Sequence, residues 1–158
     1  KRLVSTQERS DEHIKWVLTL AESKKNIGND AYANEWSNGQ GKSRIRYLYE
    51  KAAKELELIV DNPALQQESK EDDNDSADKE LLPKAKEVLI DCLNNIAAVE
   101  LRAKEYHAAK AASVKVLQRD PDNFKGLIRA AKAALLDPAS SYEEVDAAIE
   151  AAAEKAND

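Results

Sequence analysis

The sequence predicts an all-α fold built from helices that come in pairs. Apolar residues make up 42% of the 158 residues but aromatic residues only 5%, so Ala, Leu, Ile and Val supply most of the apolar surface. Only four glycines and four prolines interrupt the chain, a profile rich in helix formers and poor in breakers. Apolar residues also recur at steps of three and four, the spacing of one helix face. The length suits one domain.

The first pair of helices is predicted from Ser10 to about Glu35 and from Ser43 to Val60. Ser10 or Asp11 can cap the first helix, and the two glycines of the segment SNGQGK separate it from the second. The segment DNP at 61–63 ends the second helix, because proline disfavours helix at the residue before it.

The second pair follows a polar segment. Residues 64–80 are acidic with almost nothing to bury, and they predict a mobile, solvated loop. Helices are then expected over about 82–103 and 105–119. The segment DPDN at 120–123 marks the next break.

The third pair begins after this break. Pro121 is placed to start a helix at its first turn, and that helix is expected to end at Leu136. The segment DPASS interrupts the chain, and a last helix is predicted from about Tyr142 to Ala156. Ser141 and Glu144 have the spacing of a capping box at its start.

The middle unit carries a repeat pattern. Ala97, Ala109 and Pro121 follow one another at intervals of twelve residues. This skeleton resembles the tetratricopeptide repeat (TPR). The resemblance implies three helix-turn-helix repeats stacked as a short right-handed superhelix, an α-α solenoid. The expected organisation is an N-terminal tail at 1–9 and a single TPR domain at 10–158, with repeat one at about 14–60, an acidic loop at 61–80, repeat two at about 82–119 and repeat three at about 121–156.

Gly28 lies inside the first predicted helix, where glycine costs roughly 1 kcal/mol relative to alanine. The repeat pattern assigns it to the small-residue position at which the two helices of a repeat pack closely. Ala97 and Ala131 fill the equivalent positions of the other repeats. The alternative is a tolerated glycine or a local kink.

Five polar residues lie beside these small positions. Lys25 and Asn29 are four residues apart, as are Lys125 and Arg129, so each pair shares a helix face. Asn95 lies two residues before the small residue of its repeat. The first helix of each pair lines the concave face of such a stack. The five side chains are therefore predicted to converge on one groove, and three cations with two carboxamides suit a ligand that carries two or more carboxylates.

The segments KKNIGNDAY, LNNIAAVEL and KGLIRAAKA resemble the three first helices of dicarboxylate-clamp TPR co-chaperones. Those domains bind the extreme C-terminal Glu-Glu-Val-Asp of heat shock protein 90 and heat shock protein 70. The resemblance implies that Lys25, Asn29 and Asn95 hold the terminal α-carboxylate of the peptide. It likewise implies that Lys125 and Arg129 engage its acidic side chains.

The long gap between repeats one and two, together with the segment NFKGLIRAAKAALL, resembles immunophilin co-chaperones of the FKBP type. The likeness extends over roughly 21–156. The inner loop at 33–44 is longer than that family pattern, and no clear seventh helix follows repeat three. The resemblance implies a cytoplasmic protein, or one found in both cytoplasm and nucleus. A catalytic domain such as a peptidyl-prolyl isomerase could lie outside this fragment.

Several other functions are disfavoured. The net charge of −6 argues against a nucleic-acid partner, and no apolar run reaches the ~20 residues of a membrane span. A single cysteine, Cys92, excludes a disulfide framework and is expected to be a small buried residue. We expect no cofactor, no metal and no catalytic residues, since His13 and His107 lack nucleophile partners. The alternative function is a TPR scaffold that binds an unrelated protein segment in its concave groove.

Two further expectations concern single side chains. Trp16 and Trp36 are predicted to be packing anchors. Lys132 falls outside the five clamp positions and is expected to lie off the binding face, where it would serve as a reference lysine.

Overall fold

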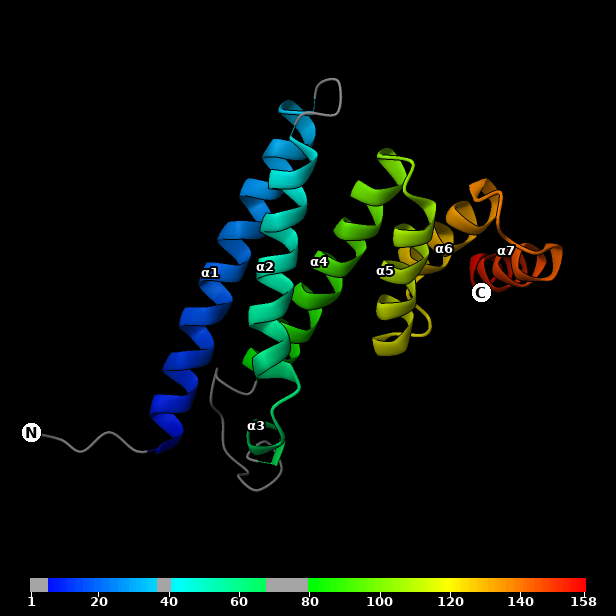
Figure 1. Cartoon of the computed structure of the whole chain (residues 1–158). Coiled ribbons are helices and arrows are strands. Elements are labelled where there is room, and N and C mark those ends of the chain that lie inside the picture. The colour runs from blue at the N-terminus through cyan, green and yellow to red at the C-terminus, as the bar shows by residue number, and fades with distance from the viewer. Residues whose placement is uncertain (1–5, 37–40, 68–79) are drawn as a thin grey trace, which may run out of the picture.

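The computed structural model describes residues 6–36, 41–67 and 80–158, and among these it contains helices and no strand. Figure 1 shows the helices, which are α1 (Thr6–Asn34), α2 (Lys42–Val60), α3 (Pro63–Gln67), α4 (Leu81–Arg102), α5 (Tyr106–Arg119), α6 (Phe124–Leu136) and α7 (Tyr142–Ala156). The all-α prediction is confirmed for this part of the chain.

The long helices pack in chain order. Helices α1 and α2 lie side by side, then α4 and α5, then α6 and α7, and each pair packs on the next (Figure 1). The first helices of successive pairs also contact one another, α1 with α4 and α4 with α6. This arrangement is compatible with an α-solenoid, in which each unit touches only its neighbours.

The helix boundaries depart from the prediction at two places. Helix α1 begins at Thr6, so Ser10 and Asp11 lie inside it and do not cap it, and part of the expected tail is helical. The short helix α3 occupies the start of the segment expected to be a loop, where it packs on α2. The rest of that segment, 68–79, lies outside the described residues, as do residues 1–5.

The start of α6 differs from the prediction as well. Pro121 lies in the preceding turn, and Asn123 is the N-cap. Its Oδ1 accepts a hydrogen bond from the backbone N–H of Gly126 at 2.9 Å. A side-chain acceptor satisfies one of the unpaired N–H groups of a helix start, and proline has no such acceptor.

Helix α7 begins as predicted. Ser141 Oγ accepts from the backbone N–H of Glu144 at 3.1 Å, which is one of the two hydrogen bonds of a capping box. The Glu144 carboxylate lies 3.2 Å from Lys110 Nζ on α5, so it joins α7 to the preceding pair.

Gly28 is buried where α1 crosses α2. A Cβ atom at this position would lie 2.8 Å from Cε1 of the buried Tyr49 ring, closer than side chains tolerate. Helix α1 runs without interruption through the glycine. The predicted close packing is therefore confirmed. Of the two alanines that the repeat pattern matches to Gly28, Ala97 is fully buried and Ala131 is half-buried.

The main core lies between α1, α2 and α4. Its fully buried members are Ala21, Ala52, Leu56, Ala85, Leu89 and Cys92, together with Val116 from α5. The prediction for Cys92 is thus confirmed. The prediction for Trp16 is wrong, because 62% of this residue is exposed. Trp36 is half-buried and packs edge-on against Tyr32, with ring centroids 5.7 Å apart.

Ion pairs tie helices together across the stack. Arg46 on α2 contacts the buried carboxylate of Glu100 on α4. Asp61, at the end of α2, accepts hydrogen bonds of 3.0 and 2.9 Å from the guanidinium of Arg119 on α5. Lys110 on α5 lies 2.7 Å from Asp137, which follows α6. These contacts reinforce the order of packing that the apolar surfaces set.

Candidate peptide-binding groove

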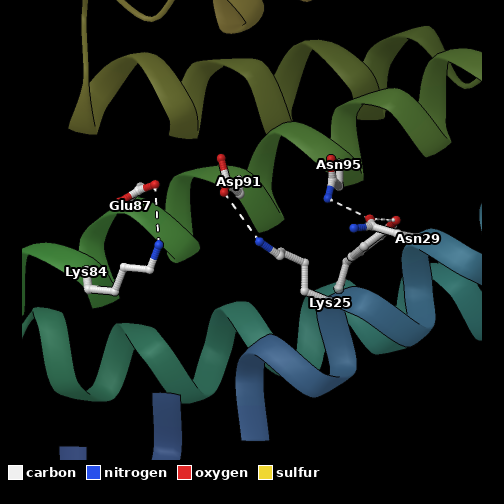
Figure 2. A network of polar contacts seen from close by, with 7 residues as sticks. Lys25, Asn29, Lys84, Glu87, Asp91 and Asn95 are labelled. Atoms are coloured by element: carbon white, nitrogen blue, oxygen red, sulfur yellow. Dashed lines mark hydrogen bonds and ion pairs between the residues drawn. The ribbon is translucent and has the colours of Figure 1, made fainter. Parts of the chain in front are cut away.

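Three of the predicted clamp residues meet between α1 and α4. Figure 2 shows Lys25 and Asn29 projecting from α1 toward α4. Asn29 Oδ1 accepts a hydrogen bond from Asn95 Nδ2 on α4 at 3.2 Å. It also accepts one of 2.6 Å from the hydroxyl of Tyr49 on α2. The fold therefore brings Asn29 and Asn95 together, as the sequence predicts.

These two hydrogen bonds orient the Asn29 carboxamide. Its oxygen accepts both hydrogen bonds, and no described residue accepts a hydrogen bond from its Nδ2. Burial is the main cause that raises the pKa of Tyr49 to about 12, so its hydroxyl remains a donor at neutral pH. Tyr49 thus positions Asn29 with a free N–H donor, the group that a carboxylate ligand requires.

Lys25 already has an acidic neighbour. Its Nζ lies 3.5 Å from Asp91 Oδ2 on α4, as Figure 2 shows. Asp91 stands one turn before Asn95, so it lies on the same face of α4. The sequence analysis missed this residue. The four-residue spacing between Asp91 and Asn95 would have been enough to find it.

Arg129 connects the cluster of Lys25, Asn29 and Asn95 to α6, in the third pair of helices. Its Nη1 donates a hydrogen bond of 2.8 Å to the carbonyl oxygen of Asn94, the residue before Asn95. Partial burial lowers the pKa of Arg129, with the phenol groups of Tyr32 and Tyr49 acting in the opposite direction. A guanidinium remains charged at neutral pH. Its charge therefore lies next to the Asn29–Asn95 contact.

Lys125 and Arg129 line an open groove of about 540 Å³ between α1, α4 and α6. The lining residues are Tyr32, Ala98, Leu101, Arg102, Phe124, Lys125, Ile128, Arg129, Lys132 and Leu136. Four of them are cationic and none is acidic. In a protein of net charge −6, this local excess of positive charge favours an anionic ligand.

Asn94 fixes α6 against α4. Its buried side chain donates from Nδ2 to Asn123 Oδ1 at 2.9 Å. That oxygen is the one that also caps α6. One acceptor therefore both starts α6 and joins it to α4, and this contact sets where Lys125 and Arg129 lie relative to Asn95.

Lys132 was expected to lie off the binding face, and this expectation is wrong. Lys132 lines the same groove as Lys125 and Arg129. The spacing accounts for this, because positions 125, 129 and 132 fall at steps of four and three on one helix face. Lys132 therefore cannot serve as a reference lysine.

Arg102 is a second groove cation that the sequence analysis missed. Its guanidinium lies 4.7 Å from the ring centroid of Tyr32 and 4.5 Å from that of Trp36. Its Nη1 donates to the Tyr32 carbonyl oxygen at 2.7 Å. Cation–π contacts of this kind hold a guanidinium in place and leave it charged.

Comparison with protein-family models gives no match to this chain. In the described residues, no group of three or more His, Cys, Asp or Glu side chains is arranged to hold a metal ion. Within the same residues, no helix has the length and apolar character needed to cross a bilayer.

Proposed function

We propose that this domain is a TPR peptide-binding module that holds the C-terminal Glu-Glu-Val-Asp tail of heat shock protein 90, heat shock protein 70 or both through a carboxylate clamp. Binding would dock a co-chaperone of the immunophilin type onto the chaperone. The observation that carries the proposal is the groove between α1, α4 and α6, which has four cations and no acid in its lining.

The first half of the clamp would hold the terminal carboxylate. Lys25 supplies a charge, and Asn29 supplies an N–H donor that no described residue occupies. Asn95 lies in direct contact with Asn29. Charge-assisted hydrogen bonds of this type contribute roughly 1.5–3 kcal/mol each.

The second half would hold acidic side chains of the peptide. Lys125 and Arg129 lie on one face of α6, and Arg129 reaches to the backbone beside Asn95. The helices are already formed, so the ordering cost of binding falls mainly on the peptide. A short peptide held by a few charged contacts is expected to bind with roughly micromolar affinity, and more weakly as salt is raised.

The test is a calorimetric titration with a peptide that ends in Met-Glu-Glu-Val-Asp and with the same peptide amidated at its C-terminus. The free acid should bind, and the amide should bind at least about tenfold more weakly, because the amide lacks the terminal charge. Equal binding of the two peptides, or binding of neither, would refute the clamp.

Variants locate the site. Lys25→Ala and Arg129→Ala should each weaken binding by at least about 1.5 kcal/mol. Lys115→Ala is the matched control, because exposed Lys115 lines a different groove, beside α2 and α5. Circular dichroism checks that Arg129→Ala still folds. An equal loss of affinity in Lys115→Ala would mean that the peptide binds elsewhere.

The alternative is a TPR scaffold that takes an unrelated segment in the same groove. The apolar share of the lining favours it, since Leu101, Phe124 and Ile128 stand among the cations. In that case affinity should follow the apolar side chains of the segment, and amidation of a C-terminal peptide should have no effect.

A further inference from the structure

Of the five clamp residues, Lys125 and Arg129 line this groove, whereas Lys25, Asn29 and Asn95 lie outside its lining. Arg102 and Lys132 line it together with Lys125 and Arg129, although neither belongs to the clamp. No carboxylate among the described residues forms an ion pair with either side chain. By contrast, Lys24, Lys42, Arg46, Lys110 and Arg119 each lie within ion-pair distance of an Asp or Glu.

The contacts between α4 and α6 put Arg102 and Lys132 at the same end of the groove. Asn94 on α4 is bonded to both Asn123 and Arg129, which fixes the register of the two helices. Lys132 stands nearly one turn beyond Arg129, and Arg102 two turns beyond Asn94. Both therefore lie toward the C-terminal ends of their helices, away from Lys25 and its partner Asp91.

Arg102 is held ready for a ligand. The Tyr32 and Trp36 rings pack against its guanidinium. Among the described residues, only the Tyr32 carbonyl oxygen accepts a hydrogen bond from it, from Nη1. A guanidinium has five N–H donors, so several remain for another acceptor. A preorganised side chain loses little further freedom when a carboxylate binds.

We infer that Arg102 and Lys132 form an additional subsite for one or more acidic side chains located before the last four residues of the bound peptide. This inference rests on the proposed function, because the terminal carboxylate must be held near Asn95. Arg102 stands seven residues beyond Asn95, about 10 Å along α4.

The length of an extended peptide fits this position. Such a peptide advances about 3.3 Å per residue, so three steps along α4 from the terminal residue bring the fourth residue from the end to the level of Arg102. The crossing from α4 to α6, about 8–10 Å between neighbouring helices, adds about two to three residues to the path. The sixth and seventh residues from the end therefore come level with the end of the groove where Arg102 and Lys132 lie. The class of ligand is a C-terminal peptide with acidic residues both at its end and upstream.

The test uses three seven-residue peptides that share the ending Met-Glu-Glu-Val-Asp and begin with Glu-Glu, Gln-Gln or Lys-Lys. The domain should bind the Glu-Glu peptide at least about threefold more tightly than the Gln-Gln peptide, and the Lys-Lys peptide most weakly. Lys132→Gln should reduce the ratio of the affinities for the Glu-Glu and Gln-Gln peptides, whatever its effect on the affinity for each peptide alone.

Arg102→Gln should remove more of the preference, and thermal unfolding shows whether this variant keeps its fold. If Arg102→Gln does not fold, Lys132→Gln still tests the subsite, because the exposed Lys132 side chain forms no ion pair with a described residue. Lys115→Gln is the control of equal charge change and should keep the full preference. A double-mutant cycle between peptide and protein isolates the pairwise effect.

The outcomes separate the two proposals. If all three peptides bind equally, or if the Glu-Glu preference survives in Lys132→Gln and Arg102→Gln, the subsite is refuted while the clamp stands. If none of the three seven-residue peptides binds, and the shorter peptide Met-Glu-Glu-Val-Asp also fails to bind, the clamp itself is refuted and the subsite with it.

Discussion

Several side chains in this molecule both pack between helices and orient a neighbouring polar group. The Tyr49 ring fills the space that Gly28 leaves open, while its hydroxyl orients Asn29. Asn94 is buried and joins α4 to the start of α6, while its neighbour Asn95 donates a hydrogen bond to Asn29 on α1. The polar groups that would bind a ligand are thus held by residues whose other role is packing, which limits their freedom before any ligand arrives.

Asp91 gives a prediction at this scale. Its carboxylate lies 3.5 Å from Lys25 Nζ and would compete with the carboxylate of a bound peptide for that charge. Asp91→Asn should therefore strengthen binding of a Met-Glu-Glu-Val-Asp peptide by about two- to fivefold, the range of exposed charge pairs. Calorimetric titration at low salt measures the change.

The control for Asp91→Asn is Glu87→Gln. Glu87 stands one turn earlier on α4 and faces Lys84 at 3.6 Å, not Lys25, as Figure 2 shows. It makes the same change in net charge and should alter affinity little. A weaker affinity in Asp91→Asn would mean that Asp91 positions Lys25 and does not compete for it.

At the scale of helices, the stability of the fold depends on close contacts between neighbouring helices. Helix α1 carries Gly28 where α2 presses on it, and the contact matters more than the helix propensity that glycine loses. The start of α6 likewise depends on Asn123 and not on the proline before it. Gly28 and Asn123 are single positions in the sequence, but the effect of each depends on the helix that packs against it.

Gly28→Ala tests this contact. Propensity alone would stabilise the helix by roughly 1 kcal/mol, but the added Cβ would lie 2.8 Å from the buried Tyr49 ring. We expect a net loss of about 1–3 kcal/mol, as for other overpacked sites. Urea denaturation gives the free energy of unfolding. Ser23→Ala, at an exposed position of α1, is the control and should be neutral or stabilising. A stabilised Gly28→Ala would contradict the packing role.

The sequence predicts the helices well and the contacts between them less well. The spacing of apolar residues gives the six long helices to within a few residues, and the clustering of Asn29 with Asn95 follows from the repeat pattern. Arg102 was not predicted because the groove is formed by three helices at once, whereas the spacing of positions 125, 129 and 132 would have been enough to place Lys132. The exposed Trp16 shows the same limit, since residue type alone does not tell which face a neighbour covers.

For the whole molecule, the stack holds together through contacts between successive helices. Its net charge is −6, yet one groove has only positive charge in its lining. Ion pairs such as Asp61–Arg119 and Asp137–Lys110 join helices that belong to different pairs. Stability should therefore depend on pH through these contacts as well as through the sum of all charges.

Asp61 gives a prediction of this dependence. The hydrogen bonds from Arg119 are the main cause that holds the pKa of this carboxyl below its ordinary value of 3.8. A lowered pKa in the folded state means that the pair stabilises the fold above pH 3.8. That contribution is lost as pH falls through the folded value. Because Asp61 is more than half exposed, the effect is at most about 1 kcal/mol.

The measurement is urea denaturation of Asp61→Asn and of the unaltered protein at about pH 6 and about pH 2.5. Asp61→Asn should be less stable than the unaltered protein at the higher pH, and the difference should be smaller at the lower one. Asp30→Asn removes an exposed carboxylate on α1 that forms no ion pair with a described residue, and it should show no such difference. A cost of Asp61→Asn that is the same at both pH values would argue against the ion pair.

The double role of Asn123 Oδ1 has a consequence for selectivity. That atom fixes the start of α6 and its contact with α4 at once, so the separation between the two halves of the groove does not adjust freely to a ligand. On the proposed mode of binding, the affinity would depend on the spacing between the charged groups of a peptide as well as on their number. A tail of the same composition with one residue inserted between its acidic side chains and its terminus would then be unable to place both groups against their partners in the groove at once.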